Sequence, residues 1–205
     1  MISHKHRCIY VHIPKTAGKS IKALFGVPEF GHDYDAEKFH WIEEPYDHHP
    51  IRKYEGRDWL RQYLKFAVVR NPWDRLVSAF FYLNRGGSNQ GDRAYRDLKL
   101  EKYGGNFDAF VHDLPHFMTD KFFRPALYWL EPSAGTGVLV DHVLRYENLV
   151  HELDVIAAPL GIPQPKLEIL NATEHPHYRD CYSGRAREIV RELYAADIAK
   201  FQYQF

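Results

Sequence analysis

Three short apolar runs along the chain predict buried β-strands. They cover Cys8–Ile13, Lys65–Arg70 and His142–Tyr146, and each is rich in β-branched or aromatic residues. Continuous apolar runs of this length are typical of strands that are buried on both faces of a parallel sheet. Each run leads into a segment with helical character. Strands that alternate with helices predict an α/β fold with a mainly parallel sheet.

The helical segments are marked by capping residues and apolar periodicity. Asn71 stands at an N-cap position with Pro72 as the first helical residue, and "WDRLVSAFFYL" continues as an amphipathic helix. Ser183 is the predicted cap of the last long helix. The predicted helices are Lys19–Phe25, ending at Gly26-Val27-Pro28, then Phe107–Leu114, Leu149–Ala158 and Gly184–Lys200.

Three segments lack a regular pattern. Residues 29–49 are rich in His, Asp, Glu and Pro and predict an irregular, exposed segment. Residues 82–106 carry five glycines and many charges, which predicts a long mobile loop. "GIPQPKLEILNATEHPHY" is rich in proline and is also predicted to be irregular.

Composition narrows the class of protein. With 205 residues and 45% hydrophobic content, residues 1–205 are expected to form a single domain with a full core. Lys and Arg together number 27, as do Asp and Glu, so no bulk positive field favours nucleic acid or acidic membranes.

The cellular setting follows from the same composition. The two cysteines, Cys8 and Cys181, are expected to be reduced thiols. The chain has no run of about 18 apolar residues and no signal peptide pattern. These features predict a soluble, cytoplasmic protein without a transmembrane segment.

The turn after the first strand, "PKTAGKS", predicts an anion site. Gly18 lets the backbone approach a ligand, Thr16 and Ser20 add hydroxyl donors, and Lys15 can reach an oxygen of the anion. A phosphate suits this turn, although an ordinary strand-to-helix turn is the alternative. The nucleoside-triphosphate loop G-x-x-x-x-G-K-[ST] does not match, because its first glycine falls on Ile13.

The second strand ends in the same manner. "VVRNPWDRLVSAF" places Arg70 at the carboxyl end of its strand and Ser78 two turns into the next helix. Both residues are therefore expected to converge on a second anion beside the first, unless Arg70 is merely a salt-bridge partner. Two anion sites without a magnesium carboxylate suggest a nucleoside with phosphates at both ends.

These motifs resemble those of a known family. "HIPKTAGKSI" is similar to the 5′-phosphosulfate loop, and "RNPWDRLVS" to the 3′-phosphate motif, of sulfotransferases that use 3′-phosphoadenosine 5′-phosphosulfate (PAPS). "VDHVLRYENL" and the C-terminal "LNATEHPHYRDCYS" and "VRELYAADIAKFQYQF" extend the resemblance over nearly the whole chain. The nearest relatives are expected among the carbohydrate (Golgi-type) sulfotransferases and their bacterial homologues.

The resemblance implies a P-loop-kinase-like three-layer fold, with a central mainly parallel sheet flanked by helices. It implies PAPS as co-substrate, adenosine 3′,5′-bisphosphate (PAP) as product, and no metal. Lys15 is implied to contact the bridging oxygen and to assist the leaving phosphate, while Arg70 and Ser78 hold the 3′-phosphate. The residues implied to bind the nucleotide are Lys15, Thr16, Ala17, Gly18, Lys19, Ser20, Arg70, Ser78, Tyr178 and Arg179. Lys19 replaces a frequent Thr, so it is expected either to hold the phosphosulfate or to face solvent.

The general base is expected between the two phosphate motifs. "YDHHPIRKY" resembles the element in which relatives place a histidine, with His48 in the better register and His49 next to it. Glu43 and Glu44 are the reserves. His12 is interpreted as a packing residue, and the histidine-rich first fifty residues lack the spacing of a zinc site.

The sequence thus predicts a PAPS-dependent sulfotransferase, with a carbohydrate hydroxyl as the acceptor by analogy with the family. The alternatives are a nucleotide-kinase-like phosphotransferase and a non-catalytic nucleotide-binding scaffold. The sequence does not determine the acceptor, the adenine-stacking residue or the oligomeric state.

Overall fold

A computed structural model describes residues 1–4, 6–25, 41–42, 48–135, 137–162 and 175–205. The chain divides into two compact units, each built from two stretches of sequence. The first unit comprises Met1–Arg70 with Ala126–Asn171, and the second comprises Asn71–Pro125 with Ala172–Phe205. The single domain expected from the sequence stays a prediction.

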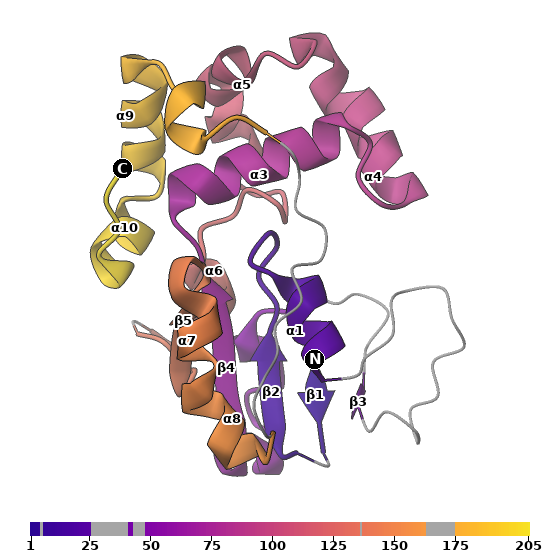
Figure 1. Cartoon of the computed structure of the whole chain (residues 1–205), viewed down its shortest axis with the longest axis vertical. Helices are drawn as coiled ribbons and strands as arrows, with labels where there is room; N and C mark the ends of the chain where they lie inside the picture. The colour runs from indigo at the N-terminus through magenta and orange to yellow at the C-terminus, as the bar shows by residue number, and fades with distance from the viewer. Residues whose placement is uncertain (5, 26–40, 43–47, 136, 163–174) are drawn as a thin grey trace. The chain divides into compact units, whose positions relative to one another are not determined.

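The first unit is built on a five-stranded sheet with the order β3-β1-β2-β4-β5 (Figure 1). The neighbours β2, β4 and β5 are parallel, whereas the short strands β1 and β3 are antiparallel additions at one edge. The α/β class with a mainly parallel sheet is therefore confirmed, as are the three predicted strands. The strands are β1 (Ile2–Ser3), β2 (Cys8–Val11), β3 (Trp41–Ile42), β4 (Leu64–Val69) and β5 (His142–Arg145).

Helices pack on one face of this sheet through a single apolar cluster. Tyr10 lies opposite Phe66 in the parallel register, and their rings stack with centroids 5.1 Å apart. Ile21 of α1 and four apolar residues of the segment that contains α7 and α8 pack into the same cluster. The helical segments of this unit are α1 (Gly18–Leu24), η1 (Ile51–Tyr54), η2 (Asp58–Gln62), α6 (Leu127–Leu130), η6 (Tyr146–Asn148), α7 (Leu149–Glu152) and α8 (Asp154–Leu160).

The second unit is helical in its described residues and has an aromatic core. The side chain of Asn71 accepts a hydrogen bond from the Trp73 amide (3.1 Å), and Pro72 begins the helix, as predicted. Phe80, Phe110 and Phe123 are fully buried in the core. The segments are α3 (Pro72–Asn84), α4 (Gln90–Tyr95), η3 (Arg96–Leu100), η4 (Glu101–Tyr103), α5 (Phe107–Asp113), η5 (Leu114–Phe117), η7 (Tyr178–Cys181), α9 (Gly184–Leu193) and α10 (Ala195–Phe201).

The predicted long loop over residues 82–106 is wrong, because most of this stretch is helical. The Asn89 side chain caps α4 by accepting from the Asp92 amide (2.9 Å). The Asp92 carboxylate is buried and accepts from the Tyr82 hydroxyl (2.6 Å) and from the Ser88 amide (3.1 Å). These bonds fix the start of α4, and Leu100 anchors the segment in the core.

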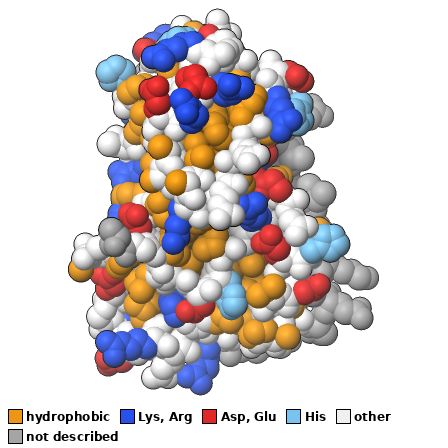
Figure 2. Space-filling view, turned by 90° about the vertical axis from the view of Figure 1, so that its left-hand side faces the viewer, with side chains coloured by type: hydrophobic (Ala, Val, Ile, Leu, Met, Phe, Trp, Pro, Cys, Tyr) orange, Lys and Arg blue, Asp and Glu red, His pale blue; other side chains and the backbone are white. Residues whose placement is uncertain are grey.

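Other boundaries differ less. Ser183 caps α9 through the Ala186 amide (3.1 Å), as predicted, but the expected helix Gly184–Lys200 is divided at Tyr194 into α9 and α10. The segment predicted to be irregular at 163–174 lies outside the described residues, as does most of 29–47. Basic and acidic side chains are interspersed on the face seen in Figure 2, in keeping with the zero formal net charge.

Candidate active site

The turn that follows β2 holds an unusual backbone conformation. Lys15 and Ala17 have φ angles of 67° and 65°, in the left-handed region that non-glycine residues rarely adopt. Each such residue costs about 1 to 2 kcal/mol, and such residues cluster at functional sites. These conformations favour a functional turn over an ordinary strand-to-helix connection, and the anion that it would bind stays a prediction.

The Thr16 side chain closes this turn from within. Its hydroxyl donates to the carbonyl oxygen of Ile13 (2.8 Å), and the residue is fully buried. Ser20, on the first turn of α1, is also buried, whereas Lys15 and Lys19 are partly exposed. The Thr16 hydroxyl thus shapes the loop, and its predicted contact with an anion stays a prediction, as do those of Ala17, Lys19 and Ser20.

Arg70 joins the ends of three parallel strands. Its Nη1 donates to the carbonyl oxygen of Lys15 (3.2 Å), and its guanidinium lies 4.2 Å from the ring centroid of Tyr146. Lys15 follows β2, Arg70 follows β4 and Tyr146 follows β5, so all three lie at the carboxyl ends of neighbouring strands. The structure thus brings the two predicted anion-binding residues together.

Tyr146 was not predicted from the sequence as a site residue. It stacks on Arg70, which is only 9% exposed, and so restricts the orientation of the guanidinium. Its position at the end of a predicted strand, equivalent to that of Arg70, is the signal that could have identified it.

His48 and His49 differ in their surroundings. Nδ1 of His48 donates to the carbonyl oxygen of His12 (2.8 Å), which leaves the lone pair of the neutral ring on Nε2. The His48 ring lies 4.2 Å from the His12 ring and 6.2 Å from the Trp129 ring. Nε2 of His49 instead accepts from the Lys53 ammonium group (3.1 Å). A ring fixed through Nδ1 with a basic Nε2 suits a general base, so the geometry favours His48.

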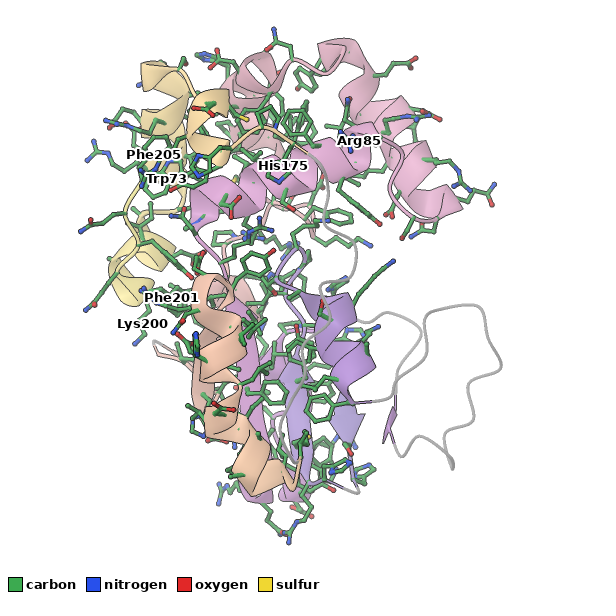
Figure 3. All side chains as sticks on the ribbon, in the orientation of Figure 1. Trp73, Arg85, His175, Lys200, Phe201 and Phe205 are labelled. Carbon is green, nitrogen blue, oxygen red and sulfur yellow. The ribbon has the colours of Figure 1, made fainter. Side chains whose placement is uncertain are left out.

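The remaining predicted nucleotide-binding residues belong to the second unit. Ser78 is buried in the middle of α3. Nη2 of Arg179 donates to the backbone oxygen of Phe205 (3.0 Å), and the Tyr178 ring lies edge-on to the Phe205 ring at 5.6 Å. Phe205 lies beside Trp73 (Figure 3), and the centroids of their rings are 5.6 Å apart. The contacts of Ser78, Tyr178 and Arg179 with a nucleotide stay predictions.

The reserve bases, a metal site and a membrane-spanning helix were also considered from the sequence. Glu43 and Glu44 lie outside the described residues. Among the residues that are described, no group of three or more His, Cys, Asp or Glu side chains is arranged to hold a metal ion. Over the same residues, no helix combines the length and apolar character needed to cross a membrane.

The fold and the site define a class of α/β proteins with a lysine-bearing loop in a left-handed conformation and a buried arginine at neighbouring strand ends. The comparison with protein families identifies the group within this class. The model of the sulfotransferase family matches residues 1–204, so the chain belongs to this family. The resemblance seen in the motifs is therefore confirmed.

The relatives are carbohydrate sulfotransferases and an archaeal protein. The chain is 29% identical to carbohydrate sulfotransferase 10 of Homo sapiens over 174 residues, which are 71% of this chain and 48% of that protein. It is 26% identical to carbohydrate sulfotransferase 14 of Danio rerio over 190 residues, 80% of this chain and 48% of that protein. An uncharacterized protein of Archaeoglobus fulgidus is 26% identical over 129 residues, 63% of this chain and 93% of that protein.

The matched region therefore spans about half the length of the carbohydrate sulfotransferases. No solved structure shows significant similarity to the chain.

Proposed function

We propose that this protein transfers a sulfuryl group from PAPS to a hydroxyl group of a carbohydrate and releases PAP. The proposal rests on the family match over residues 1–204. It is supported by the hydrogen bond between Arg70 and the Lys15 carbonyl, which joins the two anion motifs within one unit. The carbohydrate acceptor rests on the names of the relatives, carbohydrate sulfotransferases 10 and 14.

The two motifs suit the two ends of the donor. Lys15 and the backbone N–H groups of residues 16–20 hold the 5′-phosphosulfate, and Arg70 holds the 3′-phosphate. The stack on Tyr146 and the bond to the Lys15 carbonyl restrict the Arg70 guanidinium before the nucleotide binds. Such preorganisation lowers the entropic cost of binding. The nucleotide contacts of Ser78, Tyr178 and Arg179, which the family motifs imply, stay predictions.

The proposed reaction is an in-line displacement at sulfur. The acceptor hydroxyl oxygen forms a bond to sulfur while the bond between sulfur and the bridging phosphate oxygen breaks. The electron pair of that bond leaves with the 5′-phosphate of PAP, where the Lys15 ammonium group stabilises the charge. The hydroxyl proton passes to Nε2 of His48, whose Nδ1–H is held by the His12 carbonyl.

A kinase-like reaction is less well supported. The triphosphate-binding loop requires a glycine at the position that Ile13 occupies, and Ile13 is fully buried at the start of the turn. A sulfuryl group also carries less negative charge than a phosphoryl group, so the Lys15 ammonium and backbone N–H groups suffice in the proposed mechanism.

The proposed activity is tested with PAPS and a panel of oligosaccharides, with PAP release and sulfated product as the readouts. We expect turnover with at least one carbohydrate and its loss in Lys15→Ala. The matched control is Lys200→Ala, because Lys200 is an exposed lysine on α10 (Figure 3). Full activity of Lys15→Ala would rule out the assigned role of Lys15. PAP release without any sulfated carbohydrate would rule out the acceptor class.

A further inference from the structure

Gly18 and His12 meet at the start of α1. A Cβ atom placed on Gly18 would lie 1.6 Å from Nε2 of His12, 2.1 Å from its Cε1 and 2.4 Å from its Cδ2. Real Cβ contacts essentially never fall below 3.0 Å. Gly18 does not have a positive φ, so its backbone conformation does not require glycine. The imidazole of His12 is therefore what excludes a side chain at residue 18.

His12 has little room to move away from this contact. Its ring stacks on Tyr10 with centroids 5.5 Å apart and planes 20° apart, and Tyr10 stacks in turn on Phe66. Tyr10 and Phe66 are fully buried, and His12 is 8% exposed. A close-packed core responds to a clash by strain rather than by free rearrangement. The His12 ring is thus held firmly against Gly18.

The same residue contacts His48 in two ways. The His12 carbonyl accepts from Nδ1 of His48 (2.8 Å), and the two rings lie 4.2 Å apart with a 45° tilt. The hydrogen bond alone fixes one point of the His48 ring and allows the ring to tilt about it. The ring contact with His12 limits this tilt, so His12 determines the direction of the His48 Nε2 lone pair.

We propose that His12 is a positioning residue, which sets the place of the His48 base relative to the phosphosulfate loop. Residue 18 is glycine to make room for the His12 ring rather than for the phosphate of the donor. His12 acts through His48 and the loop and touches neither substrate. The assignment of His48 as base, though not the contact with Gly18, rests on the proposed function.

A double-mutant cycle tests the contact. We expect Gly18→Ala to lower the melting temperature and to weaken PAP binding by at least about tenfold, because the new methyl displaces His12 or the loop. His12→Ala removes the obstacle, so Gly18→Ala should then leave the melting temperature nearly unchanged. Gly184→Ala is the control, because Gly184 also begins a helix and a Cβ there meets nothing within 4 Å. Equal losses from Gly18→Ala with and without His12 would overturn the steric reason for glycine.

Turnover and NMR test the positioning role. In His12→Ala, we expect kcat to fall at least about tenfold while PAP affinity changes less than about threefold. Because His12→Ala keeps the backbone carbonyl that accepts from Nδ1 of His48, imidazole ¹⁵N shifts should show the Nδ1–H tautomer in both proteins. The ring ¹H signals of His48 should broaden in His12→Ala, because the ring contact that limits the tilt is lost. Unchanged kcat or unchanged line widths of the His48 ring signals would overturn the positioning role. If Gly18→Ala does not fold, recovery of folding in the double variant supports the contact and its absence contradicts it. Failure of the wild type to bind PAP would refute the proposed function, and the melting-temperature cycle would still decide the contact.

Discussion

Tyr146 provides a sharp test of how the 3′-phosphate is recognised. Its ring stacks on the Arg70 guanidinium at 4.2 Å, and Arg70 is almost fully buried. Replacement of Tyr146 by leucine removes the aromatic face but keeps an apolar side chain. We expect Arg70 to become less restricted, so that PAP binds more weakly while 5′-AMP, which lacks the 3′-phosphate, binds as before.

The magnitude follows from the type of contact. A cation–π pair contributes about 0.5 kcal/mol when exposed and about 2 kcal/mol when desolvated. The preference for PAP over 5′-AMP should therefore fall about 2-fold to 30-fold, nearer the upper figure because Arg70 is buried. Arg70→Ala sets the upper limit, since a hydrogen bond to a charged group contributes about 1.5 to 3 kcal/mol, or roughly 10-fold to 150-fold.

The assay is calorimetric titration of each variant with PAP and with 5′-AMP. Tyr146→Phe retains the ring and should keep the wild-type preference within about twofold. Tyr128→Leu removes a similar stack from Arg52, at 4.1 Å, and should leave the preference unchanged. Equal weakening of PAP and 5′-AMP binding in Tyr146→Leu would refute the reasoning, as would an unchanged preference.

Three further outcomes are expected. His48→Ala should lower kcat by about 10²-fold to 10⁴-fold at unchanged PAP affinity, whereas His49→Ala should leave kcat unchanged. Steady-state kinetics measure both variants, and a lower kcat for His49→Ala than for His48→Ala would contradict the assignment. Thr16→Val should reduce the free energy of unfolding by about 1 to 3 kcal/mol, because the buried Ile13 carbonyl loses its hydrogen-bond donor. Thr16→Ser, which keeps the hydroxyl, is the control. An unchanged free energy of unfolding for Thr16→Val in denaturant titration would refute this role of the hydroxyl. Burial raises the pKa of the Cys8 thiol from 9.0 to about 12, so the folded state holds this proton more tightly than the unfolded state. The contribution of the Cys8 thiol to the free energy of unfolding is fully present below about pH 9. It is lost as the pH rises from about 9 to about 12, by at most about 4 kcal/mol. Parallel curves of unfolding free energy against pH for the wild type and Cys8→Ala would contradict this.

The three parallel strands of the first unit could be predicted from the sequence. β2 and β4 lie in short, largely apolar runs, each strand is followed by a segment with helical character, and this alternation favours buried parallel strands. Lys15 and Arg70 could be predicted as neighbours because polar residues at the carboxyl ends of parallel strands share one edge of the sheet.

The helices at residues 90–103 could not be predicted in the same way. Five glycines in residues 82–106 outweighed the local signals in the sequence. The helix is stabilised instead by the Asn89 cap and by the buried Asp92, which depends on the Tyr82 hydroxyl ten residues away. Hydrogen bonds between side chains of this kind have no periodic signature along the chain.

Contacts that depend on the loop conformation were also missed. The left-handed conformations of Lys15 and Ala17 fold the chain so that His12 meets Gly18, six residues later. A glycine in such a motif is readily interpreted as making room for a bound ligand. Only the structure shows that the imidazole of His12 occupies the space beside Gly18. The stack of Tyr146 on Arg70 likewise depends on the pairing of β4 with β5.

The central claim is that the joined loop and arginine form a site for a nucleoside with phosphates at the 3′ and 5′ positions. The most direct test is calorimetric titration of the wild-type protein, without magnesium, with PAP, 5′-AMP and ATP. The account predicts tight binding of PAP, much weaker binding of 5′-AMP, and no gain for ATP when magnesium is added. A preference for ATP that requires magnesium would contradict it.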